Sequence, residues 1–284
     1  MLKTTGEPLR ERAFKWMLWF CMAVGLITLV VLLTYVVIKG WSRLDARLIT
    51  NMPSSVLPET AGAQSAITGT LWLMVFTALW SLPIGIMAAI YLEEYGNPNR
   101  WYNRAIEINL LNLAAVPSIV FGILGLVFIS RGMGFGPTIL TGSLTLALLV
   151  LPVVVISSRE AIRAVPQSIR AGSLALGATR WQTIYRQVLP AAIPGIATGA
   201  ILALSRAIGE AAPLLMLGVS FVRFNPDGLM SNFTALPIQI YSWTTEARPE
   251  YADLAAAASV VLLIILLSMN SVAIYIRNKT QRRW

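Results

Sequence analysis

The chain has 284 residues, of which 56% are hydrophobic and only 12% are charged. So few polar side chains cannot coat a soluble globule of this size, which excludes an ordinary soluble domain and predicts that lipid covers much of the surface. Histidine is absent and Cys21 is the single cysteine, so a histidine general base, the commonest transition-metal ligand and an internal disulfide are all excluded.

Six long apolar runs follow one another along the chain, and a membrane-spanning helix needs about 20 mostly apolar residues. The first run follows four basic residues, as in a signal peptide, but it is too long for one and no small-residue cleavage site follows it. The sequence therefore predicts an all-α membrane protein. We expect a short segment 1–16, a six-transmembrane-helix bundle over 17–277 and a basic tail 278–284, with spans at about 17–38, 67–92, 108–130, 138–157, 193–222 and 254–276.

The cysteine, two acidic residues and the prolines of these runs each allow a local prediction. Cys21 lies in the first run and is expected to be a small buried hydrophobe. Glu93 and Glu94 end the second run, where a solvated helix end is the simplest interpretation. Proline inside a span is expected to kink its helix, either in a bundle that lines a pathway or in a purely structural one; the positions are 83, 117, 152 and 213.

The basic residues predict the orientation of the bundle. If both termini are cytoplasmic, 15 of the 22 lysines and arginines fall on inside segments, six fall on outside segments and Arg206 lies within a span. Cytoplasmic loops carry such an excess of Lys and Arg. We therefore expect both termini and the loop 158–192 inside the cell, and the net charge of +9 reflects topology, not binding of nucleic acid.

The loop 158–192 is long for a loop between two spans, and its pattern is helical and amphipathic. Gly177, Trp181, Ile184 and Val188 recur at spacings of four, three and four, which predicts one helical face. Such a helix either receives a partner protein or lies on the membrane surface with its arginines near anionic lipid.

Residues 171–181 followed by Val188-Leu189-Pro190 resemble the EAA loop of permeases from ABC importers. The resemblance implies a bundle of the type I importer class, whose loop inserts into a cleft of an ATPase. It implies coupling roles here for Gly177, Ala178, Trp181, Leu189 and Pro190. The sequence departs from that family at its leading Glu-Ala-Ala, which is replaced by Ala171-Gly172-Ser173, and at Gln187, where an isoleucine is expected.

Arg206 and Glu210 form the second informative feature, because they lie four residues apart in an otherwise apolar span and so share one helical face. A charge at mid-membrane costs about 2.5–3.5 kcal/mol on insertion scales. The pair is explained either by substrate handling or by a structural ion pair. A guanidinium suits a tetrahedral oxyanion because it donates two parallel hydrogen bonds, and the carboxylate would compete with the anion and allow its release.

The run from Ser205 to Leu215 closely resembles the Ser-Arg-Ala-x-Gly-Glu-x-Ala-Pro segment of the phosphate-specific (PstA-type) permease family, and Pro117 to Gly122 resembles the same family. The resemblance implies that the chain moves inorganic phosphate into a bacterial cytoplasm as a multi-pass protein of the inner membrane. It implies alternating access, and as partners a second permease of the PstC type, an ATPase dimer of the PstB type and an external phosphate-binding protein of the PstS type, besides membrane lipid.

Other functions remain open at this stage. The cargo is alternatively sulfate, molybdate or another oxyanion, and the chain is alternatively a channel or a structural subunit without an energy source. No Gly-x-x-x-x-Gly-Lys-Ser/Thr run occurs, so ATP hydrolysis is assigned to a separate subunit. The sequence has no metal cluster or catalytic carboxylate pair and predicts neither an enzyme nor a cofactor.

Overall fold

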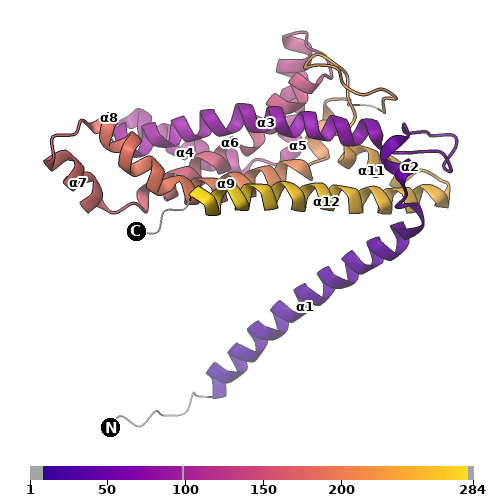
Figure 1. The fold of residues 1–284 in the computed structure, drawn as a ribbon, viewed down its shortest axis with the longest axis horizontal. Helices are drawn as coiled ribbons and strands as arrows, with labels where there is room; N and C mark the ends of the chain where they lie inside the picture. The colour runs from indigo at the N-terminus through magenta and orange to yellow at the C-terminus, as the bar shows by residue number, and fades with distance from the viewer. Residues whose placement is uncertain (1–8, 98, 220, 281–284) are drawn as a thin grey trace.

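The computed structural model describes residues 9–97, 99–219 and 221–280, and it confirms the predicted all-helical architecture (Figure 1). Among these residues the only pairing of extended backbone is an isolated bridge between Thr138 and Asn232. The elements in chain order are α1 Leu9–Gly40, η1 Trp41–Arg43, α2 Ala46–Thr50, α3 Gln64–Ile90, η2 Tyr91–Tyr95, α4 Trp101–Ala115, α5 Ser118–Leu124, η3 Gly125–Gly132, α6 Ile139–Arg163, α7 Gln167–Ala175, α8 Arg180–Thr183, η4 Ile184–Val188, α9 Leu189–Ile208, α10 Ala212–Met216, α11 Leu236–Thr245 and α12 Pro249–Thr280.

Helices α3, α6 and α9 pack side by side and form the centre of the bundle. Small residues allow this close approach. A side chain at Gly195 of α9 would place its Cβ 2.6 Å from the Cβ of Ala161 in α6, and one at Gly199 would collide with Ser157. The pair Gly195 and Gly199 therefore forms a contact face on α6, as small residues four apart do between membrane helices.

Five helices of the described chain are long and apolar enough to cross a membrane, and a bent pair makes a sixth candidate. The bend is a difference from the predicted third span, because α4 and the α5–η3 segment meet at 106° instead of forming one helix over 108–130. Pro117 lacks an N–H group, and the preceding Val116 is extended with ψ of 132°. The chain therefore turns sharply where a simple kink was expected.

The predicted fifth span over 193–222 is also interrupted. α9 ends at Ile208 with Gly209 as its C-cap, and α10 restarts at Ala212. Pro213 suits the first turn of the new helix, where a missing N–H group costs nothing. The break lies directly beside Arg206 and Glu210.

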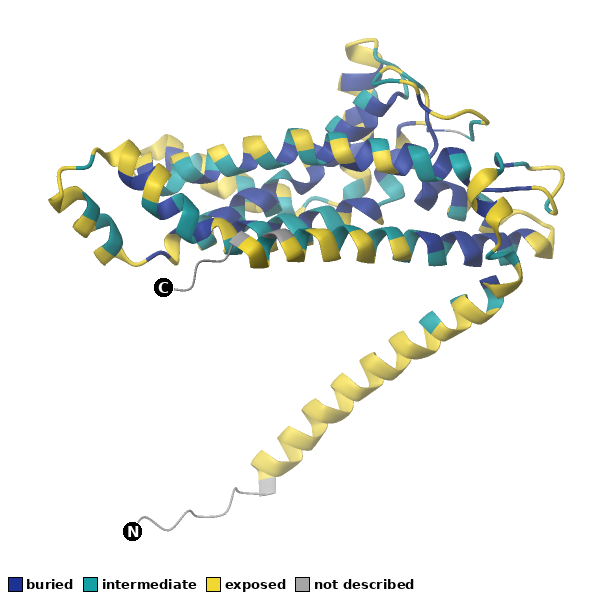
Figure 2. Cartoon of the chain, viewed as in Figure 1, coloured by how far each residue is buried: buried dark blue, intermediate teal, exposed yellow. Residues whose placement is uncertain are grey.

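Helix α1 stands apart from the bundle, as Figure 2 shows by the exposed residues along most of its length. No residue in its most apolar stretch is buried. Its last turns approach α12 and come closest at Gly40, where an added Cβ would lie 2.6 Å from the Ala257 nitrogen. Cys21 is exposed on this helix, so the expectation that it is buried was wrong. The apolar surface of α1 requires a cover of lipid or of another chain.

The two ends of the bundle differ. Figure 1 places α7 and α8, the start of α1 and the end of α12 toward one end, and α2 and α11 at the other. We call the first the hairpin end, since α7 and α8 form a helical hairpin there. It carries Arg163, Arg170 and Arg180.

Candidate functional site

Arg206 lies in the last turn of α9, and Glu210 lies in the break between α9 and α10. The Nε atom of Arg206 is 3.4 Å from Oε1 of Glu210, so the predicted approach of these two side chains is confirmed. The α9 helix closes with hydrogen bonds from the Gly209 N–H to the Arg206 carbonyl and from the Glu210 N–H to the Ala207 carbonyl. The pair is thus held at a helix end, where the sequence indicated the interior of one long span.

One face of α9, here called the open face, is largely uncovered by the rest of the described chain, although Arg277 of α12 donates from Nη1 to Oγ1 of Thr198 at 3.2 Å. Its exposed residues recur at helical spacing, whereas Ala203 and Ala207 on the other side are buried. The Arg206 side chain is 46% exposed and that of Glu210 is 19% exposed. A charge on this face is costly against lipid, so the face must meet water, a ligand or another protein chain. The open face consists of Thr198, Leu202, Arg206 and Gly209.

The two segments that resemble phosphate permeases lie against each other. Helix α5 packs on α10, and a Cβ added to Gly122 would lie 2.6 Å from the Pro213 Cα and 2.7 Å from its carbonyl oxygen. Phe121 and Leu214 from the two segments belong to the same buried core. The contact fixes α10, and with it the break that presents Glu210.

Replacing Gly122 with valine is expected to destabilise the protein by about 1–3 kcal/mol, the usual cost of overpacking a tight contact. The neighbour is backbone, which has little room to move aside. Thermal unfolding of the detergent-solubilised chain, followed by intrinsic tryptophan fluorescence, checks this. Gly25→Val is the matched control, because nothing lies within 4 Å of a Cβ at that position; equal stability of the two variants would contradict the packing described.

The predicted coupling segment is a hairpin of two helices joined by a turn. Gly177 lies in that turn with φ of +82°, a conformation that favours glycine. Thr179 then starts α8 with a capping box completed by Gln182. The prediction that Gly177 continues the helical face of Trp181 was therefore wrong, because the turn interrupts the helix before α8 begins.

The hairpin turns apolar side chains both outward and inward. Trp181 is 59% exposed and stacks on Tyr185 with ring centroids 6.0 Å apart, and Leu176 at the tip is 90% exposed. Ile184 and Val188 are buried against the bundle instead. Ala178 lies in the turn, Leu189 begins α9 and Pro190 occupies the first turn of α9. The outward apolar tip is a surface suited to a protein partner.

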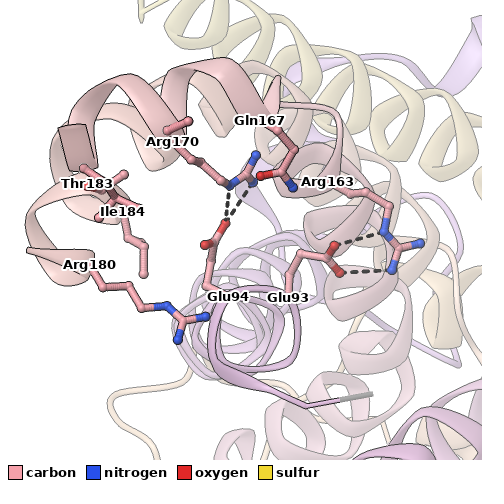
Figure 3. Close-up of a pocket in the computed structure, with 10 residues that line it drawn as sticks. Glu93, Glu94, Arg163, Gln167, Arg170, Arg180, Thr183 and Ile184 are labelled. Carbon is pink, nitrogen blue, oxygen red and sulfur yellow. Dashed lines mark hydrogen bonds and ion pairs between the residues drawn. The ribbon is translucent and has the colours of Figure 1, made fainter. Parts of the chain in front are cut away.

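The burial of Glu94 and its ion pair with Arg170 were not predicted from the sequence. Glu94 is 8% exposed and accepts two hydrogen bonds from Arg170, so the expectation of a solvated helix end was wrong there. Glu93 forms a two-bond ion pair with Arg163. Figure 3 shows both pairs beside a cavity of about 610 Å³ between η2 and the hairpin. In the sequence, these ion pairs were indicated only by two acidic residues at the end of an apolar run and by arginines in a later loop.

Known proteins resemble this chain in sequence and in fold. Residues 81–283 match the family described as binding-protein-dependent transport system inner membrane component. Among the described residues, no group of three or more His, Cys, Asp or Glu side chains is placed to hold a metal ion.

Relatives of similar length match over most of the chain. The phosphate transport system permease protein PstA 1 of Mycobacterium tuberculosis (strain ATCC 25618 / H37Rv) is 37% identical over 92% of this chain and 85% of its own. The probable ABC transporter permease protein YqgI of Bacillus subtilis (strain 168) is 34% identical over 90% of this chain and 91% of its own.

Solved structures share the fold at lower identity. A bacterial alginate ABC transporter in complex with an alginate pentasaccharide-bound periplasmic protein matches with a TM-score of 0.66 at 18% identity, over 97% of this chain and 99% of the other. The inward-facing methionine transporter MetNI matches with a TM-score of 0.62 at 18% identity, over 77% of this chain and 97% of the other.

Proposed function

We propose that this chain, which belongs to the family of binding-protein-dependent transport system inner membrane components, carries inorganic phosphate across the membrane. The chain is a multi-pass protein of the bacterial inner membrane and the permease subunit of an ABC importer. Phosphate as cargo is supported by the names of relatives that share its length, and by the chemistry of the ion pair between Arg206 and Glu210.

The half-exposed guanidinium of Arg206 is the observation that carries the proposal. A guanidinium donates parallel hydrogen bonds to two oxygens of a tetrahedral anion and keeps its charge when partly desolvated. Glu210 already accepts from Nε at 3.4 Å, a long bond that leaves the terminal nitrogens available. The carboxylate competes with phosphate for the guanidinium, so the anion is held weakly enough to leave again.

The open face of α9 is the proposed wall of the route that phosphate follows. A second permease of the PstC type would stand opposite this face, and the anion would pass between the two subunits beside Arg206. Leu202 and Thr198 continue the face from Arg206 toward the hairpin end. The route would therefore run along α9 from Arg206 toward the cytoplasm.

The orientation and the partners complete the proposal. Both termini and the hairpin end face the cytoplasm, in keeping with the excess of basic residues in those segments. An ATPase dimer of the PstB type engages the hairpin through Trp181 and Leu176, and a phosphate-binding protein of the PstS type delivers its ligand at the end that carries α2 and α11. ATP binding opens the bundle outward and hydrolysis returns it inward, which is alternating access.

Uptake of labelled phosphate by proteoliposomes that contain the complete transporter tests this function. We expect uptake that requires ATP and the binding protein, is suppressed by a tenfold excess of unlabelled phosphate, and is unaffected by the same excess of sulfate or molybdate. Suppression by sulfate or molybdate equal to that by phosphate would reassign the cargo. Uptake without ATP would point to a channel.

A further inference from the structure

Three consecutive residues at the end of the second span each contact an arginine from a later part of the chain. We call this set of contacts the η2 clasp. Each arginine comes from a different element of the hairpin end: the last turn of α6, the middle of α7 and the start of α8. The contacts of the clasp are Glu93 with Arg163, Glu94 with Arg170, and Tyr95 with Arg180. Arg159 of α6 also lies 3.6 Å from Glu93.

The central contact is the most buried ion pair of the clasp. Nε and Nη2 of Arg170 donate to Oε1 of Glu94 at 3.1 and 2.8 Å. The same guanidinium donates to the carbonyl of Ile162 at 2.9 Å and to that of Val165 at 2.5 Å. The two side chains are 12% and 9% exposed. Arg170 therefore joins η2, the end of α6 and α7 at one point.

The outer contacts extend the attachment on both sides. Arg163 donates from Nε and Nη2 to the two oxygens of Glu93, each at 3.0 Å. The guanidinium carbon of Arg180 lies 5.0 Å from the centre of the Tyr95 ring, within the range of a cation–π contact. Figure 3 shows Arg170 and Arg163 reaching Glu94 and Glu93 from two different directions.

The position of the two glutamates indicates a purpose beyond solvation. Carboxylates are unfavourable at the C-terminal end of a helix, where unpaired carbonyls already carry partial negative charge. Residues Tyr91–Tyr95 also form a π-helix, a rare geometry often found at functional sites. Nearby cations offset the carboxylate charge at this helix end, and the clasp supplies them.

Apart from the clasp, α7 is held by Ile169, which packs partly buried against the core that contains Val188, and by a hydrogen bond between the hydroxyl groups of Ser173 and Thr183. All nine residues of α7 are described and none is buried. A cavity of about 610 Å³ separates α7 from η2 and is lined by Ala171 and Leu174 together with the charged groups. The clasp thus supplies the ionic contacts that hold α7 to η2 beside this cavity, while the buried Ile184 and Val188 anchor the segment that follows α8.

We propose that Glu94 and Arg170 are positioning residues that hold the α7–α8 hairpin rigidly on α3, so that a displacement of the hairpin is passed to the centre of the bundle. Helix α3 continues directly into η2 and packs along α6, and α6 packs along α9, which carries Arg206. The inference rests on the proposed function, because it assigns to the clasp the transfer of ATPase movement to the transport route.

The test measures phosphate uptake and ATP hydrolysis together in proteoliposomes that contain the complete transporter. For Glu94→Gln and Glu94→Ala we expect hydrolysis within twofold of the parent and a ratio of phosphate moved to ATP hydrolysed that is at least fivefold lower. The near-isosteric Gln variant keeps the fold if Ala disrupts it. Glu11→Gln is the matched control, because Glu11 is exposed at the start of α1 on the same end and lies outside the clasp, so the ratio should not change.

An unchanged ratio in both Glu94 variants would overturn the inference, and so would a parallel loss of uptake and hydrolysis, which indicates a structural role alone. Backbone hydrogen exchange of the full chain in nanodiscs separates this question from the identity of the cargo. Amides of 167–183 should exchange at least tenfold faster in Glu94→Gln than in the parent. If the parent moves no phosphate, the proposed function fails, and unchanged exchange in that range then overturns the inference independently.

Discussion

Replacing Arg206 with glutamine is expected to abolish phosphate uptake while the chain still inserts and assembles with its ATPase. Two charge-assisted hydrogen bonds to the anion are lost, each worth about 1.5–3 kcal/mol. Since 1.4 kcal/mol is a factor of ten, uptake should fall on the order of a hundredfold or more. Labelled phosphate uptake in proteoliposomes checks this, with the yield of assembled transporter measured in the same preparation.

Two further variants separate a transport role for Arg206 from a structural one. Arg131→Gln removes an exposed arginine outside the proposed route and should leave uptake unchanged. The double variant Arg206→Gln with Glu210→Gln leaves no unpaired charge in the membrane, which relieves the structural cost of breaking an ion pair. Uptake should remain absent in the double variant; its recovery would show that Arg206 serves packing only.

Replacing Gly177 with valine is expected to weaken association with the ATPase at least tenfold. A residue with a Cβ pays about 1–2 kcal/mol in the left-handed conformation that Gly177 adopts, and a β-branched side chain pays more. The turn therefore shifts and displaces the outward surface formed by Leu176 and Trp181. The amount of ATPase that co-purifies with the tagged chain measures the effect.

Gly134→Val provides the matched control for that prediction. Gly134 has φ of +74° and also has nothing within 4 Å of an added Cβ, so the local strain is comparable. It lies in the turn between η3 and α6, away from the hairpin. ATPase binding should be retained in this variant. Equal loss in the two variants would mean that general destabilisation, and not the shape of the hairpin, controls association.

Patterns of local composition predicted much of this architecture. Apolar runs of about 20 residues have few alternatives to membrane helices, because a bilayer cannot satisfy free backbone groups. The separation of four residues between Arg206 and Glu210 was sufficient to predict their contact, since a helix or its last turn brings such positions together. The hairpin was foreseen as helical, but its turn at Gly177 was not.

The features that could not be predicted depend on tertiary contacts, or on how far the chain bends at a proline. Pro117 was expected to kink a helix, yet whether the chain bends slightly or by 106° depends on what packs around it. The partner of Glu94 lies 76 residues further along the chain, and no periodicity links the two positions. The exposure of α1 likewise has no local cause, because its apolar pattern resembles that of a helix packed in the bundle.

The most direct test of the account asks whether the open face of α9 lines an aqueous route used by phosphate. Leu202 is 64% exposed one turn from Arg206, and in a Cys21→Ser background Leu202→Cys provides a single reporter thiol. In the assembled transporter this thiol should react with a membrane-impermeant sulfonate reagent, and phosphate should slow the reaction; a Val31→Cys control on the exposed surface of α1 should stay unreactive. A Leu202→Cys thiol that never reacts, or reacts at one rate with and without phosphate, would contradict a route beside Arg206.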